Sequence, residues 1–134
     1  MKKVLVLCTG NSCRSIIAEA LINRLLHSSG IEARSAGSRP AGRVHPLARR
    51  LLQEYGLWEE TYRSKTIDEA LREGPYDLAV TVCDNARESC PVLPGIRTIH
   101  LPFDDPDGRP YDAFIQTKET IEAKLIPLIE KELS

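Results

Sequence analysis

The stretch that decides the fold of this chain reads Val4-Leu5-Val6-Leu7-Cys8-Thr9-Gly10-Asn11-Ser12-Cys13-Arg14-Ser15. Its apolar start predicts a buried strand, and a second apolar run with helical spacing follows from Ile16. A strand that turns through a short polar loop into a helix directs several backbone N–H groups at one point, where the helix N-terminus adds partial positive charge. Such a loop binds a tetrahedral oxyanion and favours the ionised form of a thiol at its centre. The sequence therefore predicts that Cys8 is a nucleophile within an anion-binding loop.

Individual residues of this loop suit that chemistry. Gly10 can adopt the positive φ angle that a cradle of N–H groups requires. Arg14 offers a planar pair of donors to two oxygens of an anion, and Ser15 can donate a hydrogen bond to the thiolate. We therefore expect the substrate to be bound by Thr9, Gly10, Asn11, Ser12, Cys13, Arg14 and Ser15. The alternative is an inert Cys8 at the end of a strand, beside an arginine on the surface.

The length and charge of the chain narrow the class of protein. Its 134 residues predict one domain covering residues 1–134, and a net charge of −1 does not indicate a nucleic-acid or anionic-membrane partner. No apolar run reaches membrane-spanning length, and the run at 4–7 is too short for a signal peptide. We therefore expect a cytoplasmic protein, and we take it to be a monomer. Its four cysteines would be reduced there, and hence catalytic or metal-binding rather than structural.

Predicted strands and helices alternate along the chain. Strands are expected at 3–7, 32–36, 77–82 and 97–101, and helices at 16–27, 45–55, 67–72 and 112–133. Pro127 should kink the last helix or split off its last turn. This alternation predicts an α/β fold with three layers, in which a four-stranded parallel sheet has helices on both faces. Ligands of such sheets lie at the carboxyl ends of the strands, where Cys8, Cys83 and the loop after Leu101 would meet.

A second pair of cysteines brackets the segment Cys83-Asp84-Asn85-Ala86-Arg87-Glu88-Ser89-Cys90-Pro91. Asn85 and Glu88 resemble a helix capping box and Pro91 blocks extension, so a helix of one or two turns is predicted between the cysteines. In a helix the two cysteines lie ~10 Å apart, whereas a disulfide requires Cα atoms within roughly 7 Å. A helix this short unwinds at little cost, so the pair predicts a redox switch. The alternatives are two small apolar residues around a turn, or a zinc site, which the absence of a Cys-x2-Cys pair disfavours.

The loop after the fourth predicted strand reads Pro102-Phe103-Asp104-Asp105-Pro106. A carboxyl group close to an anion site can protonate a leaving oxygen. Asp-Asp-Pro is also a common turn sequence. From the residues alone, this loop is equally consistent with a general acid and with a simple turn.

Taken together, these segments resemble the thioredoxin-coupled arsenate reductases built on the low-molecular-weight protein tyrosine phosphatase fold, and the resemblance covers nearly the whole chain. Residues 8–15, followed by Ala18-Glu19, resemble the catalytic loop of that family and the start of its helix. Ser35-Ala36-Gly37 resembles the end of its second strand. Residues 80–91 resemble its redox segment, and residues 100–106 resemble its acid loop.

The resemblance implies that three thiols reduce arsenate to arsenite in turn. Cys8 attacks arsenate held by the loop and Arg14, and Asp105 protonates the departing oxygen. Cys83 then attacks the Cys8–arsenic adduct, arsenite leaves, and a Cys8–Cys83 disulfide forms. Cys90 attacks Cys83, and thioredoxin reduces the resulting Cys83–Cys90 disulfide. This chemistry requires no cofactor and no metal ion, and it leaves the three histidines of the chain without a catalytic role.

One position departs from the family pattern. The potassium site of the family resembles Asn11, Glu19 and Ser35, with an aspartate from the loop before the third helix, where an ungapped alignment places Lys65. We hypothesise that the Lys65 ammonium group replaces the cation and pairs with Glu19, so that activity does not depend on potassium. The alternative is an exposed Lys65 and a misalignment by one residue. Strong activation by potassium over sodium would contradict the hypothesis.

Two other functions are open from the sequence. A low-molecular-weight tyrosine phosphatase, which hydrolyses phosphate monoesters through a Cys8 phosphoenzyme, shares the loop, Arg14 and Asp105. Those phosphatases typically have proline in place of Ile16 and an aromatic pair in place of Asp107-Gly108, so the reductase is favoured. A thiol sensor or oxyanion-binding module would bind without turnover. Whether thioredoxin, a glutaredoxin or a small thiol is the reductant is not readable from the sequence.

Overall fold

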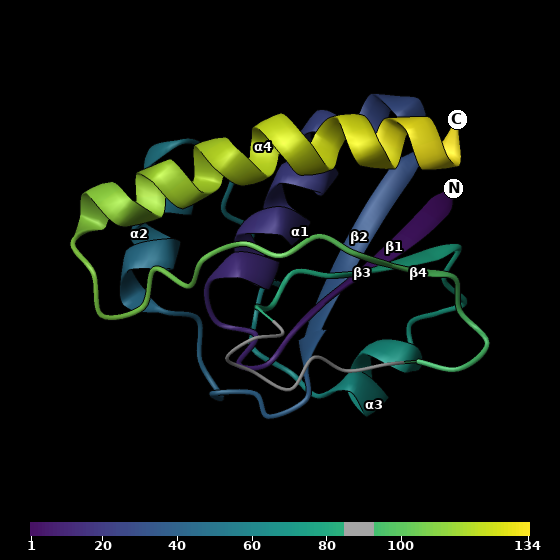
Figure 1. Ribbon diagram of the computed structural model, residues 1–134, viewed down its shortest axis with the longest axis horizontal. Helices are drawn as coiled ribbons and strands as arrows, with labels where there is room; N and C mark the ends of the chain where they lie inside the picture. Colours follow the sequence, from purple (N-terminus) through teal and green to yellow (C-terminus); the bar gives the residue numbers. More distant parts are fainter. Residues whose placement is uncertain (85–92) are drawn as a thin grey trace.

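A parallel sheet of four strands forms the centre of the molecule (Figure 1). The computed structural model describes residues 1–84 and 93–134. The strands stand in the order β2 (Ile31–Gly37), β1 (Lys2–Cys8), β3 (Leu78–Thr81) and β4 (Thr98–His100), and each overlaps a strand predicted from the sequence. Cys8 lies opposite Gly37 of β2, and Leu7 lies opposite Thr81 of β3. This register brings the carboxyl ends of β2, β1 and β3 together at one edge of the sheet, where a ligand is expected.

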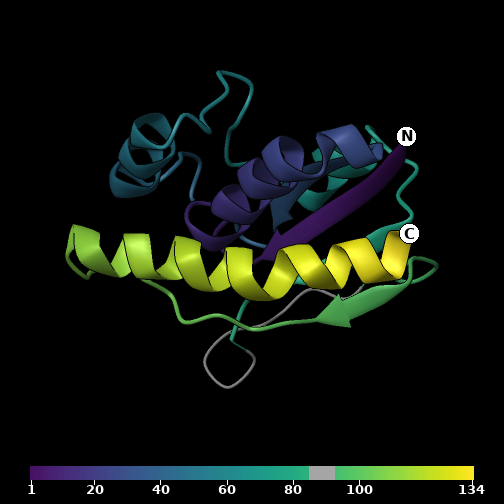
Figure 2. The same cartoon turned by 90° about the horizontal axis from the view of Figure 1, so that it is seen from above.

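Helices cover both faces of the sheet, as predicted. On one face, α1 (Arg14–Leu25) and α4 (Tyr111–Leu133) pack against each other, and α2 (Pro46–Glu54) packs beside them. The opposite face carries the short helix α3 (Ile67–Leu71), and a 3-10 helix, η1 (His27–Ser29), follows α1. Figure 1 shows α4 and α3 on opposite sides of the strands, and Figure 2 shows α4 running the length of the molecule. The three-layer α/β architecture is therefore confirmed, although its second helical layer is thin.

The run from Val4 to Leu7 explains why β1 occupies the middle of the sheet. Side chains alternate between the two faces of a strand, and here Val4 and Val6 point into the larger core beneath α1 and α4. Leu5 and Leu7 point into a smaller core on the side of α3. All four side chains are fully buried. A central parallel strand is covered on both faces, so it requires an unbroken apolar run rather than alternation with polar residues.

The sequence suggested that Pro127 could split off the last turn of the final helix. In the structure, α4 continues past Pro127 and keeps that turn. It is one helix from Tyr111 to Leu133, with Pro127 inside it. Proline lacks an N–H group, so the carbonyl of Ala123 loses its helical partner. Ala123 and Pro127 are both exposed, so water can take that place while the opposite side of the helix stays packed on the core. Although α4 has 23 residues, neither it nor any other helix in the described part of the chain is apolar enough to cross a bilayer.

Candidate active site

The loop at 9–13 joins β1 to α1 at the carboxyl edge of the sheet. Its carbonyl groups point outward, where they accept hydrogen bonds of 2.8 to 3.3 Å from N–H groups of residues 38–45; the acceptors are Cys8, Thr9, Gly10 and Ser12. Carbonyls that point outward leave N–H groups to turn inward, and the N–H of Asn11 donates to the sulfur of Cys8 at 3.2 Å. Helix α1 starts at Arg14 without a side-chain cap, so its first N–H groups also face the loop. The loop therefore has the backbone arrangement that an anion cradle requires, and the binding of an anion by its residues stays a prediction.

The residue with the positive φ angle in this loop is Asn11. The expectation that Gly10 adopts this conformation is therefore wrong. Asn11 has a φ of 47°, whereas Gly10 does not have a positive φ. Asparagine tolerates the left-handed region better than most residues do. Its amide is also held in place, because Nδ2 donates to Ser15 Oγ at 2.8 Å and to Ser35 Oγ at 2.9 Å, and Oδ1 accepts the N–H of Lys65 at 2.8 Å. Tertiary hydrogen bonds therefore stabilise the strained residue.

Gly37, at the end of β2, allows the loop to pack directly on the sheet. A Cβ atom at this position would lie 2.5 Å from the carbonyl oxygen of Thr9 and 3.0 Å from Cβ of Asn11. The first distance is too short for any side chain, so only glycine fits without displacing the loop.

A chain of buried hydrogen bonds connects Cys8 to Glu19. The Glu19 carboxylate accepts the hydroxyl of Ser35 at 2.5 Å, and Asn11 donates one amide hydrogen to Ser35 and the other to Ser15. Ser15 Oγ accepts from Asn11 and also lies 3.0 Å from the sulfur of Cys8, to which its own hydrogen can be donated. All five residues are buried. The donors of this chain thus point toward the carboxylate of Glu19 at one end and toward the sulfur of Cys8 at the other.

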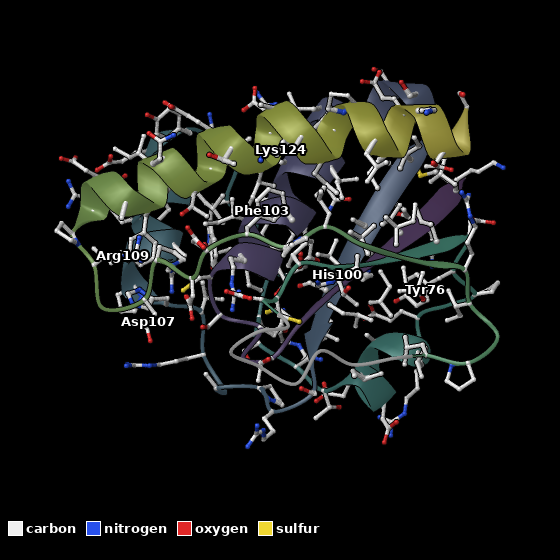
Figure 3. The ribbon with its side chains drawn as sticks, in the orientation of Figure 1. Tyr76, His100, Phe103, Asp107, Arg109 and Lys124 are labelled. Carbon is white, nitrogen blue, oxygen red and sulfur yellow. The ribbon has the colours of Figure 1, made fainter. Side chains whose placement is uncertain are left out.

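Arg14 is 3% exposed and lies against the acid loop between β4 and α4. Its Nη1 donates to the carbonyl of Phe103 at 3.1 Å, and its Nη2 lies 3.6 Å from Oδ2 of Asp105. The other oxygen of Asp105 accepts the N–H of Asp107 at 3.0 Å. Figure 3 shows Phe103 and Asp107 on this one loop. Asp104 lines a groove against α4 instead, so Asp105 is the carboxylate that faces Arg14.

The described cysteines occupy different environments. Cys13 is buried in the larger core, and burial raises the pKa of its thiol to about 12, so it is neutral at neutral pH. Cys83 is fully buried just beyond β3, and the N–H of the preceding Val82 donates to the end of β1 at 2.9 Å. Cys83 is disulfide-bonded, whereas Cys8 and Cys13 are free thiols, so the expectation that the cysteines are reduced is wrong for Cys83. Cys90 and the short helix predicted before it lie outside the described residues.

His45 belongs to the site, although sequence reasoning did not assign it a role. Its ring Nε2 lies 3.1 Å from Oδ1 of Asp107 in the acid loop, and its backbone N–H donates to the carbonyl of Ser12 in the anion loop. His45 and Asp107 are 62 positions apart. No spacing or motif connects residues so far apart, so the sequence carried no signal that could have found this contact.

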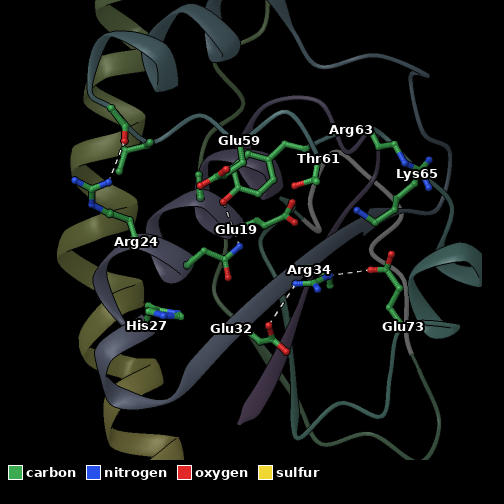
Figure 4. Close-up of a pocket in the computed structure, with 15 residues that line it drawn as sticks. Glu19, Arg24, His27, Glu32, Arg34, Glu59, Thr61, Arg63, Lys65 and Glu73 are labelled. Carbon is green, nitrogen blue, oxygen red and sulfur yellow. Dashed lines mark hydrogen bonds and ion pairs between the residues drawn. The ribbon is translucent and has the colours of Figure 1, made fainter.

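Lys65 is buried beside Glu19, so the alternative of an exposed Lys65 is wrong. The two residues are 5% and 2% exposed and line a pocket of about 570 Å³ between α1, β2 and residues 56–65 (Figure 4). Figure 4 shows the Lys65 ammonium group pointing toward Glu19. Burial raises the pKa of Glu19 to about 7, and the charge of Lys65 acts against that rise. The positive charge of Lys65 near Glu19 disfavours a further cation there, and both the replacement of potassium by Lys65 and the independence from potassium stay predictions.

We expect Glu19→Gln to change how the stability of the fold depends on pH. The pKa of Glu19 rises from its ordinary 4.5 to about 7 on folding, so the folded state binds this proton more tightly and stability falls as pH rises through that window. Between pH 5 and pH 8 the loss is about 2 to 3 kcal/mol. Glutamine can still accept the Ser35 hydrogen bond but does not titrate, so urea unfolding of the variant should lack this decline. Identical pH profiles for the variant and the wild type would contradict the expectation.

Comparison with known proteins places these features in a family. The chain matches the family described as low molecular weight phosphotyrosine protein phosphatase over residues 3–134. Arsenate reductase 2 of Staphylococcus epidermidis is 34% identical over 131 residues, which cover 92% of this chain and 93% of the relative. The crystal structure of an arsenate reductase from Archaeoglobus fulgidus has a TM-score of 0.80 at 34% identity and covers 95% of this chain and 98% of that one. A thioredoxin-dependent arsenate reductase of Corynebacterium glutamicum has a TM-score of 0.74 at 30% identity, over 98% of this chain and 61% of the other.

The fold and the site together define an α/β protein with an anion loop built around a buried thiol. The chain belongs to the low-molecular-weight phosphotyrosine protein phosphatase family. The three similar proteins described above are all named arsenate reductases, which confirms the resemblance drawn from the sequence.

Proposed function

We propose that this protein reduces arsenate to arsenite with Cys8 as its nucleophile. One observation carries the proposal, namely the position of the Cys8 sulfur among the inward N–H groups of the loop. The N–H of Asn11 lies 3.2 Å from that sulfur and the hydroxyl of Ser15 lies 3.0 Å from it, while Arg14 supplies the positive charge that a tetrahedral oxyanion requires. The named arsenate reductases to which the chain is similar support arsenate as the oxyanion.

In the first step the Cys8 thiolate attacks arsenic, an S–As bond forms, and one As–O bond breaks. The loop N–H groups and Arg14 hold the remaining oxygens and offset their charge. Asp105 protonates the departing oxygen, which leaves as water, while arsenic stays pentavalent. Oδ1 of Asp105 accepts the N–H of Asp107, so Oδ2, which lies on the side of Arg14 and the anion loop, is the oxygen placed to reach the departing group.

In the following steps two thiols supply the two electrons. Cys83 attacks the sulfur of Cys8, the S–As bond breaks, and its electron pair passes to arsenic, which leaves as arsenite. Cys8 and Cys83 are thereby oxidised to a disulfide. Cys90 attacks Cys83 and releases Cys8, and the dithiol of thioredoxin reduces the Cys83–Cys90 disulfide. The place of Cys83 beside the end of β1 supports its role, and the role of Cys90 depends on the sequence resemblance.

The relay predicts different stalled states for two cysteine variants. With thioredoxin, thioredoxin reductase and NADPH, Cys90→Ser should release one arsenite per enzyme and stop as a Cys8–Cys83 disulfide. Cys83→Ser should stop earlier, at the arsenic adduct, and release no arsenite. Arsenite yield per enzyme and mass spectrometry of the trapped species distinguish these states, with repeated turnover by the wild type as the reference. Repeated turnover by Cys90→Ser would refute the relay.

Hydrolysis of phosphate monoesters is a second candidate function, and membership of the phosphatase family favours it. Phosphate and arsenate share their shape and charge, so the same loop can hold either. A phosphatase would hydrolyse p-nitrophenyl phosphate through Cys8 and would not need Cys83. The two functions are separated by comparing arsenite release with p-nitrophenyl phosphate hydrolysis in the wild type and in Cys83→Ser. A reductase loses the first activity in that variant, whereas a pure phosphatase shows only the second activity in both proteins.

A further inference from the structure

We propose that His45 is a positioning residue for Asp105, because it ties the acid loop to the anion loop and holds the carboxyl group at the mouth of the site. The inference rests on the proposed function, in which Asp105 is the general acid. It concerns a histidine that no sequence motif marks and that would not touch the substrate.

His45 contacts four parts of the site at once. Its backbone N–H donates to the carbonyl of Ser12 in the anion loop at 3.0 Å. Ring Nδ1 accepts the N–H of Leu47 at 3.1 Å and so caps α2, while Nε2 lies 3.1 Å from Oδ1 of Asp107. The ring also packs on Phe114 in the first turn of α4, with 4.8 Å between the ring centres. The imidazole is therefore held from several directions and has little freedom to rotate.

These partners determine which ring nitrogen carries the proton. A backbone N–H can only donate, so Nδ1 of His45 must be the acceptor for Leu47. The ring hydrogen of the neutral imidazole is then on Nε2, where it donates to the carboxylate of Asp107. One histidine thus uses both nitrogens in the roles that the neutral ring allows, with the cap on one side and the acid loop on the other.

The hydrogen bond between His45 and Asp107 completes a closed ring of contacts. Asp107 donates its N–H to Oδ1 of Asp105, and Oδ2 of Asp105 lies 3.6 Å from Arg14. Arg14 follows the anion loop directly, and the Ser12 carbonyl of that loop accepts the N–H of His45. The side chain of Asp105 is 47% exposed, so packing alone does not hold it in place. The residue that anchors one oxygen of the acid is therefore the residue that His45 holds.

Two substitutions of His45 distinguish the role of its Nδ1 atom from the role of its Nε2 atom. Asparagine places its amide oxygen near the position of Nδ1, so His45→Asn keeps the cap on α2 but cannot reach Asp107. Glutamine places its amide nitrogen near the position of Nε2, so His45→Gln keeps the donor to Asp107 and loses the cap. If His45 has a purely structural role, His45→Gln, which lacks the cap, should have the lower rate of the first chemical step. If His45 positions Asp105, His45→Asn should have the lower rate.

We expect His45→Asn to slow the first chemical step about 10-fold, because a general acid contributes about 10²- to 10⁴-fold and a misplaced acid loses part of that effect. The rate is measured as single-turnover consumption of arsenate by fully reduced enzyme. Binding of arsenate, and of phosphate as a competitor, should change less than about twofold, since the loop N–H groups and Arg14 are unaffected. His45→Gln should keep at least about half of the wild-type rate, and Asp107→Ala, which removes the same hydrogen bond, should match His45→Asn.

A double-mutant cycle with Asp105→Asn separates a failure of this inference from a failure of the proposed function. Asp105→Asn should slow the first step about 100-fold, and adding His45→Asn should cost less than about twofold more. Asp104→Asn, which changes the neighbouring carboxyl group that does not face Arg14, is the matched control and should keep the wild-type rate.

Each other outcome is informative. The inference is overturned if Asp105→Asn is slow while His45→Asn keeps the wild-type rate. It is also overturned if His45→Asn lowers the rate by the same factor in the Asp105→Asn background as in the wild type. It is also overturned if His45→Gln is as slow as His45→Asn, or if phosphate binding weakens in parallel with the rate, because the damage is then general. A wild-type rate for Asp105→Asn refutes the acid step of the proposed function itself, and the role of His45 with it.

Discussion

Cys8→Ser is expected to lower the rate of arsenate reduction by at least about 10⁴-fold, because a serine hydroxyl is not ionised at neutral pH and cannot form the disulfide that reduces arsenic. The serine oxygen would take the place of the sulfur beside the Asn11 N–H and Ser15, so the loop should keep its shape. Phosphate binding, which depends on the loop N–H groups and Arg14, should therefore persist. Arsenite formation with thioredoxin, thioredoxin reductase and NADPH measures the first effect, and calorimetry with inorganic phosphate measures the second.

Cys13→Ala is the matched control for this experiment. Cys13 lies in the same loop, but burial raises the pKa of its thiol to about 12 and leaves it unreactive at neutral pH. Its replacement should leave the rate within about threefold of the wild type, because only a thiolate acts as the nucleophile. Reduction by Cys8→Ser at a rate close to the wild type, or complete loss of activity in Cys13→Ala, would show that the nucleophile has been misassigned.

Arg14→Lys is expected to lower kcat/KM for arsenate about 10²- to 10³-fold, which corresponds to about 3 to 4 kcal/mol of transition-state stabilisation. Arg14 donates to the Phe103 carbonyl through one nitrogen and lies near Asp105 with another, so its guanidinium is held between the two loops. A lysine keeps the positive charge but presents a single point donor, which cannot keep the Phe103 contact and also bind two oxygens of the substrate. Steady-state kinetics with arsenate, together with phosphate inhibition, measure the loss.

Arg39→Lys provides the control for Arg14→Lys. Arg39 lies beside the anion loop, where its backbone N–H donates to the Thr9 carbonyl, but its side chain is exposed. The same substitution there should change kcat/KM less than about twofold, since the overall charge is unchanged and no oxyanion contact is lost. The guanidinium group of Arg14 does not act on the substrate if kcat/KM falls by similar amounts in both variants. The same conclusion follows if kcat/KM of Arg14→Lys stays within about threefold of the wild type.

Sequence reasoning succeeded where the decisive residues lie close together in the chain. The strand and helix that flank the anion loop follow from local apolar periodicity, and Cys8 and Arg14 belong to the one loop between them. It failed within that loop, where Gly10 was expected to have the positive φ and Asn11 has it. Glycine is the residue with the lowest intrinsic cost for that conformation, but hydrogen bonds from Asn11 to distant residues such as Ser35 offset the cost for asparagine.

By itself, the sequence determined the α/β architecture, the anion loop and the cysteine at its centre, because apolar periodicity and short spacings govern these features. Only the tertiary structure decided which carboxylate faces Arg14, that Lys65 is buried beside Glu19, and that His45 reaches the acid loop. Arg14 and Phe103 are 89 positions apart, and His45 and Asp107 are 62 positions apart. The packing of the whole sheet and its helices sets such distances, and no local pattern of residues encodes them.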